Sequence, residues 1–278
     1  MKEITRQIRE SLCNYYNESE VVALTRILAT ELLDLKESLY FLKEPVTLSN
    51  EQETTLQNAI KDLQKFTPIQ YIIGYEYFCG LKFKVNSSVL IPRPETQELV
   101  TWITDKATGT ERILDIGTGS GCIAISLAHR MPKSSITAWD ISNNALSMAQ
   151  ENSNANNTNV LFAQKDILSY IPGDEQFDII VSNPPYIKEI EKRTMEKNVL
   201  DYEPHIALFV PNEDPLLFYR VIAQKAQKML TGNGALYFEI NRAHGNEIIE
   251  MLRNMGYQHI ELRKDFADND RMIKAIKR

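Results

Sequence analysis

Four residues whose types could do chemistry follow one another in this sequence: Asn183, Pro184, Pro185 and Tyr186. A mostly apolar stretch, residues 178–181, precedes them and is typical of a buried strand. One interpretation is that the prolines end that strand, because proline has no N–H to donate to a neighbouring strand. The other is that carbonyls without N–H groups, an asparagine oxygen and an aromatic ring form a pocket that accepts hydrogen bonds from a planar –NH2 group.

Three glycines, Gly117, Gly119 and Gly121, lie between a predicted strand and a predicted helix. Glycine permits a tight turn and a close approach of a ligand to the backbone, although this spacing differs from that of dinucleotide-binding loops. The next predicted strand ends at Asp140, about 20 residues further on, where an acidic residue binds a ribose diol in related folds. Because aspartate is also a common N-cap residue, capping of the following helix is the alternative role of Asp140.

Two further acidic residues stand at strand ends. Asp115 directly precedes the glycines and is a candidate partner for the amine of an amino-acid group on a cofactor. Asp166 ends the third predicted strand, where it could contact an adenine amino group or simply form a turn. Glycine turn, acidic residues and strand order together predict a cofactor that carries a nucleoside.

Strands that alternate with helices must position these residues. The predicted strands span residues 112–117, 134–140, 159–166, 177–183 and 234–240. The predicted helices span residues 121–130, 143–152, 215–230 and 244–255. This alternation predicts right-handed crossovers and a mostly parallel sheet, in which the first and fourth strands are neighbours. Two final predicted strands, residues 259–265 and 271–277, should pair antiparallel.

The first part of the chain has a different pattern. Apolar residues at helical spacing predict a small helical domain over residues 1–72, and Ser49 followed by Gln52 predicts a capping box at one helix start. Alternation around Gly80 predicts a β-hairpin in a linker over residues 73–95. A rigid turn, Ile-Pro-Arg-Pro-Glu, then leads into the next helix.

Composition limits the class of protein. The chain has 278 residues, 43% hydrophobic and 24% charged, and a net charge of −6, which argues against a large phosphate-binding surface. Three scattered cysteines and four dispersed histidines form no metal-ligand spacing, so we expect no metal. Without a membrane-spanning run or an apolar leader, we expect a cytoplasmic protein.

The motifs resemble those of a known family. The stretches LDIGTGSGCIAISLA and IVSNPPYI, together with Asp140, resemble class I S-adenosylmethionine-dependent methyltransferases that act on planar nitrogen. Residues 67–100, which include VLIPRPET, and the stretch YEPHIAL resemble the peptide chain release factor glutamine-N5 methyltransferases. The resemblance extends over nearly the whole chain, with departures at Gln97, residues 209–216 and residues 239–245.

The resemblance implies a function and a fold. The fold class would be α/β, a Rossmann-like doubly wound sheet with an antiparallel last strand, preceded by a small all-α domain; residues 96–278 would form the methyltransferase domain. The methyl group of S-adenosylmethionine would move to the side-chain amide nitrogen of glutamine in the Gly-Gly-Gln motif of class I release factors, leaving S-adenosylhomocysteine. The helical domain would help to hold the release factor, with no nucleic acid bound directly. We expect a monomer.

The site residues follow from these motifs. The residues expected to bind the cofactor are Asp115, Gly117, Thr118, Gly119, Ser120, Gly121, Asp140, Ile141, Asp166, Ile167 and Asn183. The residues expected to act in catalysis are Asn183, Pro184, Pro185 and Tyr186, and these, with Arg93 and Glu95, are expected to bind the substrate. No general base is evident.

Some alternatives remain open at this point. A methyltransferase acting on an exocyclic amine of a base in DNA or RNA would need the same pocket, and a nucleotide-binding adaptor without catalysis would need only the cofactor residues. Arg93 and Glu95 either shape the site or form a structural salt bridge. Glu203 and Pro204 belong either to a solvated loop or to a lid over the substrate pocket.

Overall fold

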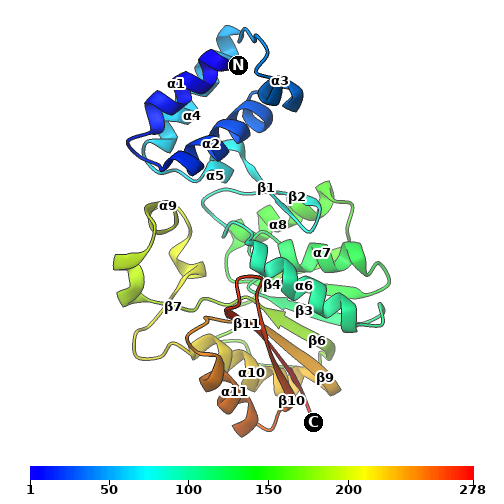
Figure 1. Ribbon diagram of the computed structural model, residues 1–278. Helices are drawn as coiled ribbons and strands as arrows, with labels where there is room; N and C mark the ends of the chain where they lie inside the picture. The colour runs from blue at the N-terminus through cyan, green and yellow to red at the C-terminus, as the bar shows by residue number, and fades with distance from the viewer. The chain divides into compact units, whose positions relative to one another are not determined.

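The computed structural model describes all residues, 1–278, and the chain divides into two compact units (Figure 1). The helical unit comprises residues 1–74 and 196–202, and the sheet unit comprises residues 75–195 and 203–278. The boundaries proposed from the sequence, at residues 72 and 95, do not include the return of residues 196–202 to the helical unit. None of the helices is long and apolar enough to span a bilayer.

Short amphipathic helices build the helical unit around one apolar core. They are α1 (Lys2–Leu12), α2 (Glu18–Ile27), the π-helical turn η1 (Leu28–Leu32), α3 (Glu37–Leu42), α4 (Asn50–Leu63), α5 (Ile69–Ile73) and α9 (Lys197–Leu200). The capping box predicted at Ser49 and Gln52 is confirmed, and it starts α4. The returning segment is held by Tyr202, whose hydroxyl donates to the Lys65 carbonyl at 2.9 Å.

A seven-stranded sheet forms the centre of the sheet unit, in the order β10-β11-β9-β6-β3-β4-β5. Its strands are β3 (Arg112–Ile116), β4 (Ser135–Asp140), β5 (Val160–Gln164), β6 (Phe177–Ser182), β9 (Leu230–Glu239), β10 (Gln258–Lys264) and β11 (Asp270–Ile276). Strands β5, β4, β3, β6 and β9 are parallel, whereas β11 pairs antiparallel with both β9 and β10. The predicted fold class and the antiparallel final pair are confirmed.

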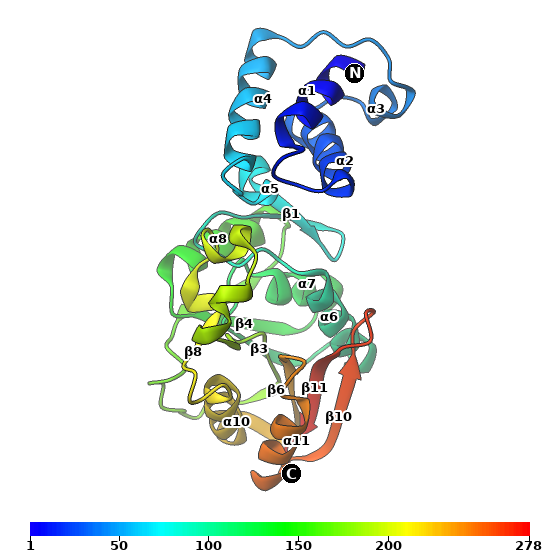
Figure 2. The ribbon, with the colours of Figure 1, turned by 60° about the vertical axis from the view of Figure 1, so that its left-hand side comes forward.

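Helices cover both faces of this sheet (Figure 2). They are α6 (Pro94–Lys106), α7 (Cys122–Arg130), α8 (Asn143–Ala155), α10 (Leu217–Met229) and α11 (Gly245–Asn254), with short 3-10 turns η2 (Glu189–Thr194) and η3 (His205–Ala207). Side chains on a strand alternate between faces, so Ile179 packs with α6 and α7 while Ile180 packs with α10 and α11. Burial on both faces explains why the strands read as apolar runs.

Two small two-stranded sheets complete the sheet unit. Strands β1 (Tyr75–Phe78) and β2 (Leu81–Lys84) form the predicted hairpin, and β7 (Ile187–Lys188) pairs with β8 (Phe209–Val210). The hairpin turns through Cys79 and Gly80, with φ of 52° and 80°. Positive φ at both positions matches the tight turns that favour the right-handed twist of a hairpin.

Gly121 joins the glycine turn to α7 and has no room for a side chain. Its φ is 83°, and a Cβ there would lie 2.7 Å from Cδ1 of Ile125 and 3.1 Å from Cβ of Ala149. Both the left-handed backbone and the contact with α8 therefore require glycine.

We expect Gly121→Ala to lower the free energy of unfolding by about 2–4 kcal/mol, because left-handed strain and overpacking add. Urea unfolding monitored by circular dichroism measures this change. Gly173→Ala is the matched control, since nothing lies within 4 Å of a Cβ at that position. Equal midpoints for the two variants would contradict this account of Gly121.

Candidate active site

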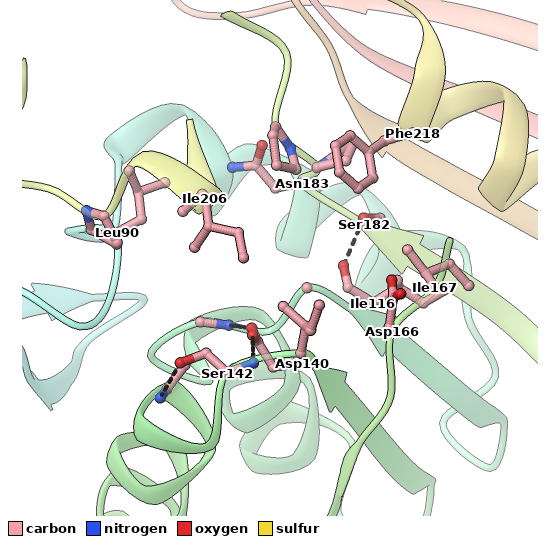
Figure 3. A pocket seen from close by; sticks show the side chains of 18 of the residues that line it. Leu90, Ile116, Asp140, Ser142, Asp166, Ile167, Ser182, Asn183, Ile206 and Phe218 are labelled. Atoms are coloured by element: carbon pink, nitrogen blue, oxygen red, sulfur yellow. Dashed lines mark hydrogen bonds between the residues drawn. The ribbon is translucent and has the colours of Figure 1, made fainter. Parts of the chain in front are cut away.

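Two neighbouring parallel strands bring the sequence motifs together. Strands β3 and β6 pair with Ile116 opposite Ser182, so the glycine turn and Asn183 leave the sheet side by side. The Ser182 hydroxyl donates to the Ile116 carbonyl at 2.6 Å and ties the two strand ends (Figure 3). The prediction that the first and fourth strands of the sheet are neighbours is confirmed.

A pocket opens at this edge of the sheet. Its walls come from residues 88–90, 140–142, 165–168, 182–185, 204, 206 and 207, with backbone from the glycine turn and side chains from the end of β3, from α8 and from α10. In Figure 3, Asn183 and Phe218 lie across the hollow from Asp140 and Ser142. The pocket is thus bounded by the ends of four strands, which is where parallel α/β sheets bind ligands.

Most of the predicted site residues line this pocket, and some lie behind it. Those in the lining are Gly117, Gly119, Asp140, Ile141, Asp166, Ile167, Asn183, Pro184 and Pro185. Those outside the lining are Arg93, Glu95, Asp115, Thr118, Ser120, Gly121 and Tyr186. The wall residues Ile206 and Phe218 were not predicted, because an apolar residue in a loop or helix carries no signal of its own.

Asp115 is fully buried beneath the glycine turn. The Thr118 hydroxyl donates to its Oδ2 at 2.6 Å, whereas Oδ1 has no hydrogen-bond partner. Burial raises the pKa of Asp115 to about 7. A buried carboxylate oxygen without a partner is costly. The predicted role of Asp115, as the partner of an amine on a cofactor, stays a prediction.

Asp140 stands between the glycine turn and α8. Its Oδ2 accepts from the Gly119 N–H and its Oδ1 from the Ser142 N–H, both at 2.9 Å. The helix is capped instead by Ser142, whose hydroxyl oxygen accepts from the Ala145 N–H at 3.2 Å. Asp140 is therefore not the N-cap. It lines the pocket, and each of its oxygens can still accept a further hydrogen bond.

The wall after β5 is held by a lysine that the sequence did not single out. Asp166 accepts from the Leu168 N–H at 2.9 Å, which fixes a tight local turn. The ammonium of Lys225, on α10, donates to the carbonyls of Ile167, Leu168 and Tyr170 at 2.6, 3.0 and 2.6 Å. Burial lowers the pKa of Lys225. A lysine on a helix gives no sequence signal that it reaches three carbonyls in another loop.

The first three residues of the Asn-Pro-Pro-Tyr segment line the pocket, whereas the tyrosine does not. Asn183, Pro184 and Pro185 line the pocket, where they offer acceptors and no backbone N–H from the prolines. The Tyr186 ring packs instead against the apolar core beneath α10 and α11, and burial raises the pKa of its hydroxyl well above the usual range. The structure therefore does not bring this ring into the pocket lining.

A buried salt bridge ties two walls of the pocket together. The Glu203 carboxylate is 3% exposed, pairs with the Arg93 guanidinium and accepts from the Ile91 N–H at 3.2 Å. Burial raises the pKa of Glu203, and the guanidinium opposes this effect. Arg93 forms a salt bridge, with Glu203 as its partner; the role of Arg93 and Glu95 toward the substrate stays a prediction. Pro204, next to it, lines the pocket rather than a solvated loop.

Comparison with known proteins identifies the family. The model described as "Methyltransferase small domain" matches residues 94–201, and that described as "PrmC N-terminal domain" matches residues 3–74. A release factor glutamine methyltransferase of Bacteroides thetaiotaomicron is 46% identical over 277 residues, which cover 99% of both chains. That of Flavobacterium psychrophilum is 44% identical over 280 residues, which cover 99% of this chain and 98% of the relative. This chain belongs to the release factor glutamine methyltransferase family.

Solved structures support the fold of this methyltransferase. A methyltransferase from Pyrococcus furiosus superposes with a TM-score of 0.53 at 20% identity and covers 71% of this chain and 89% of its own. A 16S rRNA N2 methyltransferase from Thermus thermophilus, in complex with AdoMet and guanosine, has a TM-score of 0.53 at 16% identity, over 73% of this chain and 50% of its own. At these identities the likeness shows the fold alone.

For the salt bridge, we expect Glu203→Gln to lower the free energy of unfolding by about 1–3 kcal/mol, because the buried carboxylate loses its charged hydrogen bond to the half-buried Arg93 guanidinium. Glu18→Gln is the matched control, since Glu18 pairs with Arg9 at 2.8 Å on an exposed surface, where such pairs contribute about 0–1 kcal/mol. Thermal and urea unfolding measure both variants. An equal, small loss of unfolding free energy in both variants would show that the Glu203 salt bridge does not stabilise the pocket wall.

Proposed function

We propose that this protein transfers the methyl group of S-adenosylmethionine to the side-chain amide nitrogen of the glutamine in the Gly-Gly-Gln motif of class I release factors. One observation supports this most directly: Asn183, Pro184 and Pro185, which offer several acceptors and no proline N–H, line the same pocket as the glycine turn. Membership of the release factor glutamine methyltransferase family supports the same substrate.

The residues around the pocket suit S-adenosylmethionine. The orphan Oδ1 of Asp115 offers a counter-charge for an amine, and the free lone pairs of Asp140 offer acceptors for a ribose diol. Ile141 and Ile167 give apolar contact for an aromatic base near Asp166. When bound, S-adenosylmethionine supplies an electrophilic methyl group on a positively charged sulfur.

The protein acts mainly by positioning, because an amide nitrogen is a poor nucleophile with its lone pair delocalised. Asn183 Oδ1 and the Pro184 carbonyl accept the two N–H bonds of the substrate amide and hold its nitrogen in line with the methyl group. In the transfer the amide nitrogen would gain the methyl carbon, the electron pair of the broken carbon–sulfur bond would stay with the leaving sulfur, and one N–H proton would pass to water. Near-attack positioning of this kind can contribute about 7–11 kcal/mol, and oriented carbonyl dipoles add to it.

The ribose contact can be tested apart from catalysis. We expect Asp140→Asn to weaken S-adenosylhomocysteine binding by about 10–100-fold, because hydrogen bonds to a charged acceptor contribute roughly 1.5–3 kcal/mol. Isothermal titration calorimetry measures this affinity. The control is Asp174→Asn, at an exposed position, which should bind S-adenosylhomocysteine as tightly as the unchanged protein. If Asp140→Asn also keeps the full affinity, the proposed contact of Asp140 with the ribose is wrong.

The substrate can be tested with four acceptors: an unmodified class I release factor, its Gly-Gly-Gln→Gly-Gly-Ala variant, total RNA and total DNA. With S-adenosylmethionine labelled in its methyl group, we expect label on the first acceptor alone. Asn183→Ala should lower this transfer by about 10²–10³-fold, as loss of a preorganised transition-state contact does. Label on RNA or DNA would overturn the proposal and favour methylation of a base amine.

A further inference from the structure

Two buried polar residues lie directly behind Asn183. The Asn183 Nδ2 donates to Oγ1 of Thr96 at 3.5 Å, and the Thr96 hydroxyl donates to Oε2 of Glu239 at 2.6 Å. Thr96 and Glu239 are each 2% exposed. Neither residue lines the pocket, so they reach it only through Asn183.

Three elements bring this chain of hydrogen bonds together. Strands β6 and β9 are parallel neighbours with Ser182 opposite Phe238. Asn183, the first residue after β6, therefore lies level with Glu239, the last residue of β9. Thr96 comes from the first turn of α6, directly after the segment tied by the Arg93 salt bridge. The arrangement is therefore built from the sheet register and a fixed helix start rather than from a loose surface contact.

The order of donors and acceptors from Glu239 through Thr96 to Asn183 determines the orientation of the Asn183 side-chain amide. A hydroxyl has one hydrogen, and an ionised carboxylate can only accept. The Thr96 hydrogen is therefore committed to Glu239, which leaves only lone pairs on Oγ1. Only the –NH2 end of Asn183 can face those lone pairs, so its Oδ1 must turn away from Thr96.

Without this partner, the two orientations of the amide would be nearly equivalent. The terminal torsion of asparagine is broad and roughly two-fold, and the –NH2 and oxygen ends occupy similar space. The reversed orientation would present an –NH2 group to the substrate amide, and two donors facing one another repel. The acceptor function of Asn183 thus needs a neighbour that selects one orientation.

We infer that Thr96 and Glu239 are positioning residues that hold the Asn183 amide with its oxygen available to the substrate nitrogen. This inference deepens the proposed glutamine methylation and rests on it for the identity of that nitrogen. The hydrogen-bond network itself can be observed without a substrate.

Protonation of Glu239 would reverse the network. Burial raises the pKa of Glu239 to about 7, and the Thr96 hydrogen bond and Arg271 oppose this effect. A protonated carboxyl donates to Thr96, whose hydrogen is then free to turn to Asn183 Oδ1. The other titratable or charged side chains that act on Glu239 are Arg93, Glu95, Cys122, Tyr186 and Tyr219.

The first test compares variants in methyl transfer to the release factor. We expect Thr96→Val to lower kcat at least tenfold, with S-adenosylhomocysteine affinity within about threefold, and Thr96→Ser to restore activity because it keeps the hydroxyl. Thr104→Val is the control, since the Thr104 hydroxyl only donates to the Thr101 carbonyl of the same helix. In the wild-type protein kcat should fall as the pH is lowered through about 7, and Glu239→Gln should remove this fall because it cannot take up a proton.

The second test observes Asn183 directly by NMR, with 15N-labelled asparagine and assignment by the loss of one –NH2 signal in Asn183→Asp. The shift of the Asn183 Nδ2 signal should titrate with a midpoint near pH 7 in the wild type and stay constant in Glu239→Gln. A constant shift in the wild type, or full kcat in a folded Thr96→Val variant, would overturn the inference. A titrating signal in a protein that methylates no release factor would support the network and refute the proposed function instead.

Discussion

The position of β6 between β3 and β9 is the constraint on which the site depends. Parallel pairing puts Ile116 opposite Ser182 and Ser182 opposite Phe238. The glycine turn, Asn183 and Glu239, the last residue of β9, therefore lie at one level of the sheet. A shift of one residue in either pairing would exchange the side chains that β6 packs into the two cores. The core packing that stabilises the fold therefore also fixes the register of the site.

Much of this arrangement could be predicted from local patterns. Alternation of strands and helices predicted the parallel sheet. The spacing of Asp140 from the glycines predicted an acidic residue at the end of the next strand, and the apolar run before Asn183 predicted the strand that precedes it. Each of these signals lies within one short segment or one crossover. Strand order then followed from general rules of α/β topology, which is why distant motifs could be placed at one edge.

Other parts of the site depend on contacts between segments far apart in the sequence. Glu203 lies in a polar stretch, yet it is buried by Arg93 and Ile91, which are more than a hundred positions away. Lys225 and Glu239 also have distant partners, which lie in the loop after β5 and in the first turn of α6 respectively. The return of residues 196–202 to the helical unit also has no local signal. Burial of a charged residue is decided by tertiary packing, which a single sequence does not reveal.

The two proposed acceptors, Asn183 Oδ1 and the Pro184 carbonyl, also bear on how many times one nitrogen can react. An unmodified amide brings two N–H groups to the two oxygens of the proposed site, but a methylated amide brings one. One buried acceptor then stays unsatisfied, at a cost of about 1–3 kcal/mol, and the new methyl group occupies the space beside it. Product would leave more readily than substrate, and a second methylation of the same nitrogen would be disfavoured. The number of N–H groups on the amide would thus limit the reaction to one methyl group per nitrogen.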